Sequence, residues 1–83
     1  MTNIISLSDL PARLGADIKR LRMEKGVSQE ALALLAEVDR TYVSQLERGI
    51  ANPSLLILYR IAEALDAQLD VSFTKREGNL TRS

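Results

Sequence analysis

Two stretches with helical patterning are separated by only two residues, Glu37 and Val38. Ser28 is placed to begin the first stretch and Asp39 to begin the second, because their side chains accept hydrogen bonds from the amides of a first helical turn. A link this short leaves no room for a gradual turn, so the two helices must meet at a steep angle. No other feature limits the folds available to the chain as strongly.

The second of these helices, predicted at residues 39–49 with the sequence DRTYVSQLERG, has an apolar and a polar side. Val43 and Leu46 stand three apart and can point inward together, and Gly49 suits the left-handed turn that ends a helix. The polar side carries Arg40, Thr41, Ser44, Gln45 and Arg48. Guanidinium and amide groups make paired hydrogen bonds to base edges, so this helix suits the major groove of DNA. An ordinary solvated helix face is the alternative interpretation.

Two further segments have apolar residues at helical spacing. Ser8, Asp9 and Pro11 begin the first of them, because capping side chains and an early proline are typical of a helix start. Gly26 ends it, directly after Lys25, whose charge is favourable at that end of the helix dipole. The apolar stripe of this first helix consists of Leu10, Leu14, Ile18 and Leu21.

Ser54 begins the last helix, whose apolar stripe is Leu55, Leu58, Ile61, Ala62 and Leu65. Leu56, Ile57 and Tyr59 make this helix apolar on more than one side, which indicates a partner surface. In the helix that begins at Ser28, the residues expected to face inward are Leu32, Leu35 and Ala36. The chain is therefore expected to form an all-α fold.

After residue 66 the apolar period changes to two residues, since Leu69, Val71 and Phe73 alternate with polar side chains. A lone strand has no partner within the chain, so this segment is either an extended tail or half of a sheet completed by a second molecule. The expected organisation is a flexible arm at residues 1–7, a helical domain at 8–66, a dimerisation strand or extension at 67–75 and a disordered tail at 76–83.

Composition excludes several classes of function. Eighty-three residues allow one domain, and the absence of both Cys and His removes disulfides, thiolate metal sites and the commonest general base. No nucleophile or acid–base pair can be assembled, so neither an enzyme nor a cofactor is expected. Apolar runs are too short for a bilayer, so no membrane contact and a cytoplasmic location are expected. Eleven basic and eleven acidic residues cancel, which lowers the expectation of a nucleic-acid partner without excluding it.

Residues 14–65 resemble the Cro/phage-repressor (XRE-like) helix-turn-helix family. The resemblance is carried by KG-x-SQE-x-LA, then RTY-x-S-x-LERG, then NPSL before an apolar helix. It implies a compact lambda-repressor-like bundle of four to five short helices, to which a short C-terminal β-strand would be added. The family often has Gly in the turn between its second and third helices, where this chain has Glu37. A left-handed backbone at that residue would cost about 1–2 kcal/mol.

The resemblance also implies roles for individual residues. Base-contacting positions are matched by Arg40, Thr41, Ser44 and Gln45, and positions that contact the DNA backbone by Gln29, Tyr42, Arg48 and Asn52. Gln29 also matches a position that braces the recognition helix. Arg22 and Glu47 match a partly buried ion pair, with unrelated surface charges as the alternative. Tyr42 could instead pack with its hydroxyl in water, and Ser44 has a short reach.

The implied function is a sequence-specific transcriptional regulator that binds a palindromic DNA operator as a homodimer. Restriction–modification controller proteins share the third-helix motif but usually continue with a fifth helix, whereas HipB-like antitoxins continue with a strand that pairs with the dimer mate. An antitoxin that neutralises a toxin or other protein partner and represses its own operon is therefore the alternative function. The residues expected at the dimer interface are Leu56, Ile57, Leu69, Val71 and Phe73.

Overall fold

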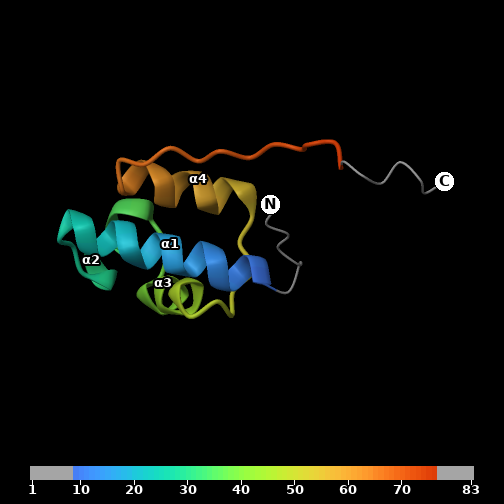
Figure 1. Ribbon diagram of the computed structural model, residues 1–83. Helices are drawn as coiled ribbons and strands as arrows, with labels where there is room; N and C mark the ends of the chain where they lie inside the picture. The colour runs from blue at the N-terminus through green and yellow to red at the C-terminus, as the bar shows by residue number, and fades with distance from the viewer. Residues whose placement is uncertain (1–8, 77–83) are drawn as a thin grey trace.

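The computed structural model describes residues 9–76, which form four helices in one bundle (Figure 1). The helices are α1 (Leu10–Lys25), α2 (Gln29–Ala36), α3 (Arg40–Glu47) and α4 (Leu55–Ala64). α3 packs against both α1 and α2, and α4 packs against α2. The expected all-α bundle is confirmed. The arm expected at residues 1–7 and nearly all of the tail expected at 76–83 lie outside the described residues.

The core lies where the four helices meet. Leu32, Val43 and Ile61 are the largest fully buried side chains, and each comes from a different helix. The other buried apolar residues are Ile18, Ala33, Ala36, Leu46, Ala51, Ala62 and Leu65. α1 supplies only Ile18 to these buried apolar residues, fewer than each of the shorter helices. Within the described residues, no helix is long and apolar enough to cross a membrane.

Three leucines predicted to face the core are exposed instead. Leu35 is 57% exposed, because the inner face of α2 is made of Leu32, Ala33 and Ala36 and is narrow. Leu55 is 63% exposed, because the buried residues of α4 lie in its second half. Leu10 is 41% exposed at the start of α1. The three predictions were wrong for a shared reason. Helical spacing shows which side of a helix is apolar, but not how much of that side the neighbouring helices cover.

All four helices end in the same way, with a left-handed residue just beyond the helix. These residues are Gly26, Glu37, Gly49 and Asp66. In each case the next amide donates to a carbonyl five residues earlier, as Val38 does to Ala33 over 3.0 Å and Ala67 does to Ala62 over 2.8 Å. This arrangement satisfies carbonyls that a helix end leaves unpaired. It also reverses the chain within two residues, so short helices can pack tightly.

The two-residue link between α2 and α3 is strained at Glu37, whose φ is 61° and ψ is 46°. An L-residue with a Cβ is disfavoured in this region, whereas Gly is not. Glu37→Gly is therefore expected to raise the free energy of unfolding by about 1 kcal/mol, because relief of strain outweighs the entropy that Gly adds to the unfolded chain. Urea denaturation measures this, with Glu37→Ala as the control that keeps the Cβ. A stability gain for Ala equal to that for Gly would contradict the backbone explanation.

α1 approaches α3 closely because Gly15 lies at their contact. A Cβ on Gly15 would overlap the carbonyl oxygen of Leu46 and come within 2.9 Å of that of Glu47. Just beyond, a Cβ on Gly49 would lie 2.9 Å from the Cα of Ala12. The backbones of α1 and of the end of α3 therefore touch directly. Gly15 was not singled out from the sequence, because a glycine inside an apolar stripe looks like any other small residue.

Gly15→Ala is expected to lower the free energy of unfolding by about 1–3 kcal/mol, although alanine is normally the better helix former. The added methyl group meets backbone rather than a side chain that could rotate away, so α1 and α3 must separate. Thermal or urea unfolding measures the change, and Ala16→Ser at the exposed neighbouring position is the matched control. An increase in stability for Gly15→Ala would show that the helices are not in contact at this point.

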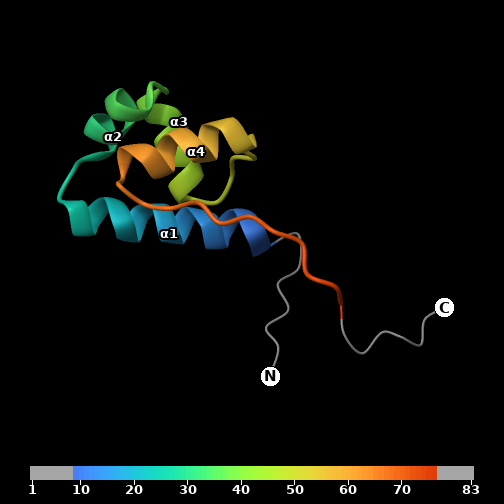
Figure 2. The same ribbon diagram turned by 90° about the horizontal axis from the view of Figure 1, so that it is seen from above.

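Residues 67–76 run back along the bundle in an extended path (Figures 1 and 2). Within the described chain they form no strand, so the short C-terminal strand is not present in the single chain. A strand requires a neighbour for its backbone groups, and nothing in one copy supplies it. At the start of this segment, Lys25 donates a 2.6 Å hydrogen bond to Asp66 and thereby ties the end of α1 to the end of α4. This hydrogen bond lowers the pKa of Asp66.

Candidate nucleic-acid interface

α3 presents a polar face to solvent, as its sequence predicts. Val43 and Leu46 point inward and are 0% and 3% exposed. Arg40, Thr41 and Arg48 are exposed on the opposite side. Ser44 and Gln45 are half-buried, so their side chains have less freedom than those of the flanking arginines. The outer face of α3 therefore combines hydrogen-bonding groups with a rigid apolar base.

The start of α3 differs from the expectation in one detail. Asp39 precedes the helix with an extended backbone, but its side chain makes no capping hydrogen bond. Its carbonyl instead accepts from the amides of Tyr42 and Val43. The hydroxyls of Ser28 and Ser54 do cap α2 and α4, accepting from backbone amides over 3.0 and 3.2 Å. The cap predicted for the Asp39 side chain is therefore wrong, and only its position at the helix start holds.

The far end of α3 is held by a buried ion pair between Arg22 and Glu47. Arg22 donates from Nε to Glu47 Oε2 over 2.6 Å and from Nη2 to Oε1 over 3.1 Å. The Glu47 side chain is only 3% exposed and that of Arg22 13%. The hydrogen bond with Glu47 raises the pKa of Arg22 above its already high ordinary value, so the guanidinium stays protonated. α1 and α3 are therefore joined by a paired guanidinium–carboxylate contact.

Two further groups complete this network. Gln29, the first residue of α2, donates from Nε2 to Glu47 Oε1 over 3.0 Å. Arg22 Nη1 donates to the carbonyl of Val27 over 2.9 Å, in the turn between α1 and α2. The Glu47 carboxylate thus accepts three hydrogen bonds from two other helices. The first three helices are fixed to one another through this single carboxylate.

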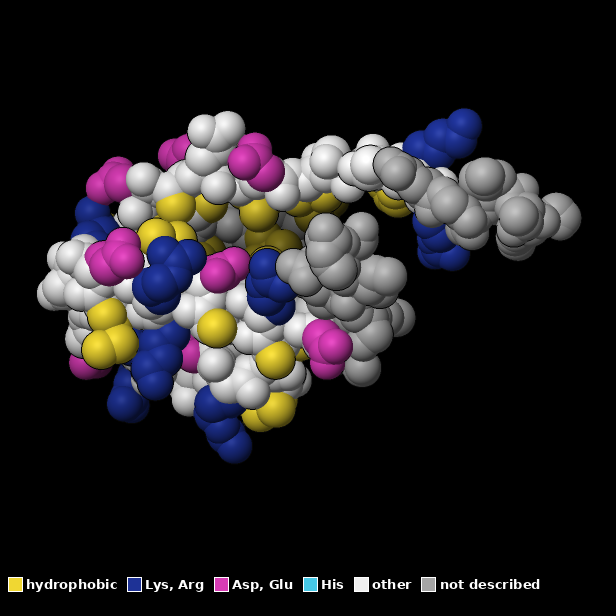
Figure 3. All heavy atoms as spheres, viewed as in Figure 1, with side chains coloured by type: hydrophobic (Ala, Val, Ile, Leu, Met, Phe, Trp, Pro, Cys, Tyr) yellow, Lys and Arg dark blue, Asp and Glu magenta, His cyan; other side chains and the backbone are white. Residues whose placement is uncertain are grey.

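Unpaired positive charge is available on α3. Within residues 9–76, neither Arg40 nor Arg48 forms an ion pair, whereas Arg20, Arg22 and Lys25 of α1 are all paired with acids. The cations near the end of α1 are therefore largely neutralised by their own chain. On the face drawn in Figure 3, dark-blue and magenta side chains are mixed rather than separated. The arginines of α3 are therefore available to an anionic ligand, although the surface as a whole shows no separate basic face.

The remaining residues expected to contact DNA lie within α3 or before and after it in the chain. Tyr42 is half-buried and packs against the core, which supports a packing role for its ring. Asn52 is exposed in the loop that follows Gly49, next to Ala51, which is buried. Gln29 is half-buried because it reaches Glu47. Gln29 and Asn52 thus precede and follow α3 in the chain, and Tyr42 belongs to α3 itself.

Comparison with known proteins gives a family and its relatives. The family model described as helix-turn-helix matches residues 18–71. The control protein C.MunI of a Mycoplasma species is 39% identical over 72 residues, which are 86% of this chain and 97% of that protein. The crystal structure of the restriction-modification controller protein C.AhdI from Aeromonas hydrophila has 43% sequence identity and a TM-score of 0.69, over 70% of this chain and 88% of that one. C.Esp1396I bound to a 25-base-pair operator site has 37% identity and a TM-score of 0.67, over 71% and 78%.

The buried ion pair is expected to show strong coupling in a double-mutant cycle. Arg22→Met should lower the free energy of unfolding by about 3 kcal/mol, because the buried Glu47 carboxylate loses its countercharge. Replacing both residues with Met should cost less than the sum of the single changes. Arg20→Met, which removes exposed pairs with Asp17 and Glu24, is the matched control and should change stability by about 1 kcal/mol or less. Additive single changes would contradict the coupling.

Proposed function

We propose, from the premise that this chain belongs to the helix-turn-helix family, that it is a DNA-binding transcriptional regulator whose helix α3 enters the major groove. The observation that carries the proposal is the outer face of α3: two unpaired arginines and three smaller polar side chains on a helix fixed by a buried ion pair. A single helix has the width to enter the major groove of B-form DNA. A recognition helix must also be held rigidly, and the Glu47 network supplies that rigidity.

Base recognition is assigned to four side chains of α3. Arg40 suits guanine, because its guanidinium can donate to both acceptors of that base edge, and Gln45 suits adenine, which offers one donor and one acceptor. Thr41 and Ser44 have shorter side chains with hydroxyl groups that accept or donate. All four lie on the exposed or half-buried side of the helix. Arg40 and Gln45 are expected to carry most of the sequence preference, since only they can make paired contacts.

Contact with the DNA backbone is assigned to Gln29, Tyr42, Arg48 and Asn52. The Gln29 amide has two N–H groups, of which one donates to Glu47, so the other can donate to a phosphate. This residue would then couple the ion pair to the DNA strand. Arg48 is unpaired and exposed at the end of α3. Such contacts position a protein on the duplex without selecting its sequence.

The chain is proposed to act as a homodimer on a palindromic operator. One α3 helix contacts only one half-site, and two copies related by a two-fold axis would place their recognition helices about 34 Å apart, one turn of duplex. A duplex of 25 base pairs, such as the operator bound by C.Esp1396I, is long enough for two half-sites. The antitoxin alternative is not favoured, because the relatives are named control proteins and transcriptional regulators. A regulator of this kind would work without a catalytic step, in the cytoplasm.

Sequence preference tests the proposal. The preferred site is first selected from random duplexes, and binding of the variants is then measured on that site and on unrelated DNA at one salt concentration. Arg40→Ala and Gln45→Ala should each weaken binding to the preferred site by about 1–3 kcal/mol and relax the preference at one base position. Arg13→Ala, an exposed arginine of α1, is the control and should have little effect on preference. Equal losses on both DNAs would show that these residues contact only phosphates.

A further inference from the structure

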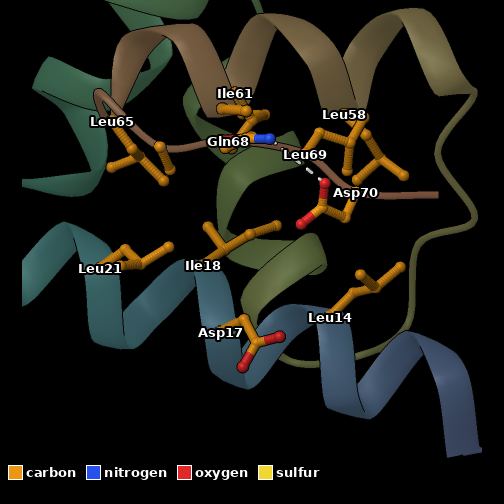
Figure 4. A pocket seen from close by; sticks show the side chains of 12 residues that line it. Leu14, Asp17, Ile18, Leu21, Leu58, Ile61, Leu65, Gln68, Leu69 and Asp70 are labelled. Carbon is orange, nitrogen blue, oxygen red and sulfur yellow. Dashed lines mark hydrogen bonds between the residues drawn. The ribbon is translucent and has the colours of Figure 1, made fainter.

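The segment after α4 covers part of a groove between α1 and α4 (Figure 4). The groove has a volume of about 280 Å³, and its apolar lining includes Leu14, Ile18, Leu21, Leu58, Ile61 and Leu65. Along the segment, burial alternates: Ala67 and Leu69 are half-buried, whereas Gln68 and Asp70 are exposed and linked to each other by a 3.3 Å hydrogen bond. Ala67 and Leu69 are therefore the more buried residues of the segment, in the two-residue alternation of a strand, although Gln68 and Asp70 also line the groove.

This apolar face continues beyond the edge of its own domain. Val71 is 60% exposed and Phe73 is wholly exposed, although in an extended chain both lie on the same side as Leu69. Figure 3 shows the segment leaving the globule, with apolar side chains lining the hollow beneath its first part. Within the part of the chain that is described, no backbone–backbone hydrogen bond involves residues 68–76. Unpaired backbone groups beside exposed large apolar side chains are the properties of a sheet edge without its neighbour.

We propose that residues 69–73 of two copies of this chain pair as an antiparallel two-stranded ribbon, with Val71 opposite Val71 on the two-fold axis. The proposal rests on the homodimer proposed above and specifies its interface. In this register Phe73 of each copy lies opposite Leu69 of the other, at the mouth of the groove between α1 and α4 of that other copy. The exposed aromatic ring thereby covers apolar surface that one chain leaves open.

The two-fold axis could also be centred on Asp70 or on Ser72 and still place the apolar side chains of both copies on one face of the ribbon. The positions of the charged residues favour Val71. Centring the two-fold axis on Asp70 would place two carboxylates opposite each other, which is unfavourable. Centring it on Ser72 would place Lys75 opposite Leu69. With Val71 on the axis, the basic end of each segment, Lys75 and Arg76, lies over the other end of its copy, where Asp66 is exposed and already bonded to Lys25. The segment thus complements its own copy in both apolar pattern and charge.

Single-cysteine variants test the register directly, since the chain has no cysteine of its own. Opposed residues on the axis bring their Cα atoms to about 4.5–5.5 Å, within the range that a disulfide spans. Val71→Cys should therefore form a covalent dimer rapidly under mild oxidation, whereas Ser72→Cys and Gln68→Cys should not, because their copies are offset along the ribbon. Faster linkage through Ser72→Cys, or equal linkage at all three positions, would overturn the proposed register.

Sedimentation of the full chain without DNA tests whether the ribbon holds the dimer. Phe73→Ser should raise the dimer dissociation constant by at least about 100-fold, since two aromatic side chains lose their cover, and circular dichroism should show an unchanged helix content. Leu35→Ser, at an exposed leucine on α2, is the matched control and should leave dimerisation unchanged. Arg76→Glu should raise the constant by about two- to tenfold, and Lys75→Glu, opposite Ala67, by less.

The alternatives predict different results from the same measurements. A dimer that survives Phe73→Ser but dissociates on Leu56→Ser would place the interface on α4 and overturn the ribbon. A chain that stays monomeric at all concentrations would show that residues 67–76 serve only their own groove, and would overturn it too. These measurements contain no DNA, so they can refute the ribbon while the assignment of α3 to the major groove stands. Conversely, the DNA-binding measurements can refute that assignment while the ribbon stands.

Discussion

The structure depends on one buried carboxylate, that of Glu47. α3 has eight residues, far fewer than an isolated helix needs to be stable in water, so its direction is set by its neighbours. Glu47 accepts hydrogen bonds from Arg22 on α1 and from Gln29 on α2, and the side chains of the ion pair are 13% and 3% exposed. A charge buried in this way stabilises only one arrangement of its partners, because any other leaves it unpaired. The orientation of the outer face of α3 follows from that requirement.

Tight helix ends make this arrangement possible in so short a chain. The left-handed residues after each helix reverse the chain quickly, and Gly15 lets the backbones of α1 and α3 come into contact. One of these ends is strained, since Glu37 occupies a conformation that favours glycine. Strain of this kind is often found beside functional surfaces, and here it adjoins the helix proposed to enter the groove. The chain keeps the turn geometry at a cost in stability.

Much of the fold could be predicted from local signals in the sequence. The four helices, the short turn and the inward direction of Val43 and Leu46 follow from spacing and capping residues, which act over a few positions. The exposure of Leu35 and Leu55 could not be predicted, because it depends on how far neighbouring helices extend. The role of Gly15 depends on a contact with residues some thirty positions away, and the left-handed Asp66 lacks the glycine that marks such ends. The Arg22–Glu47 pair came from family resemblance rather than from spacing.

The central claim is that the outer face of α3, held by Glu47, contacts bases in the major groove. Its most direct test is the change in backbone amide chemical shifts when the labelled protein is titrated with the selected duplex and, separately, with a scrambled duplex of the same length. The changes specific to the selected duplex should concentrate at residues 40–45 and at Gln29, with small changes in α4. Changes confined to α4 and residues 67–76, with α3 unaffected, would contradict contact between α3 and the bases.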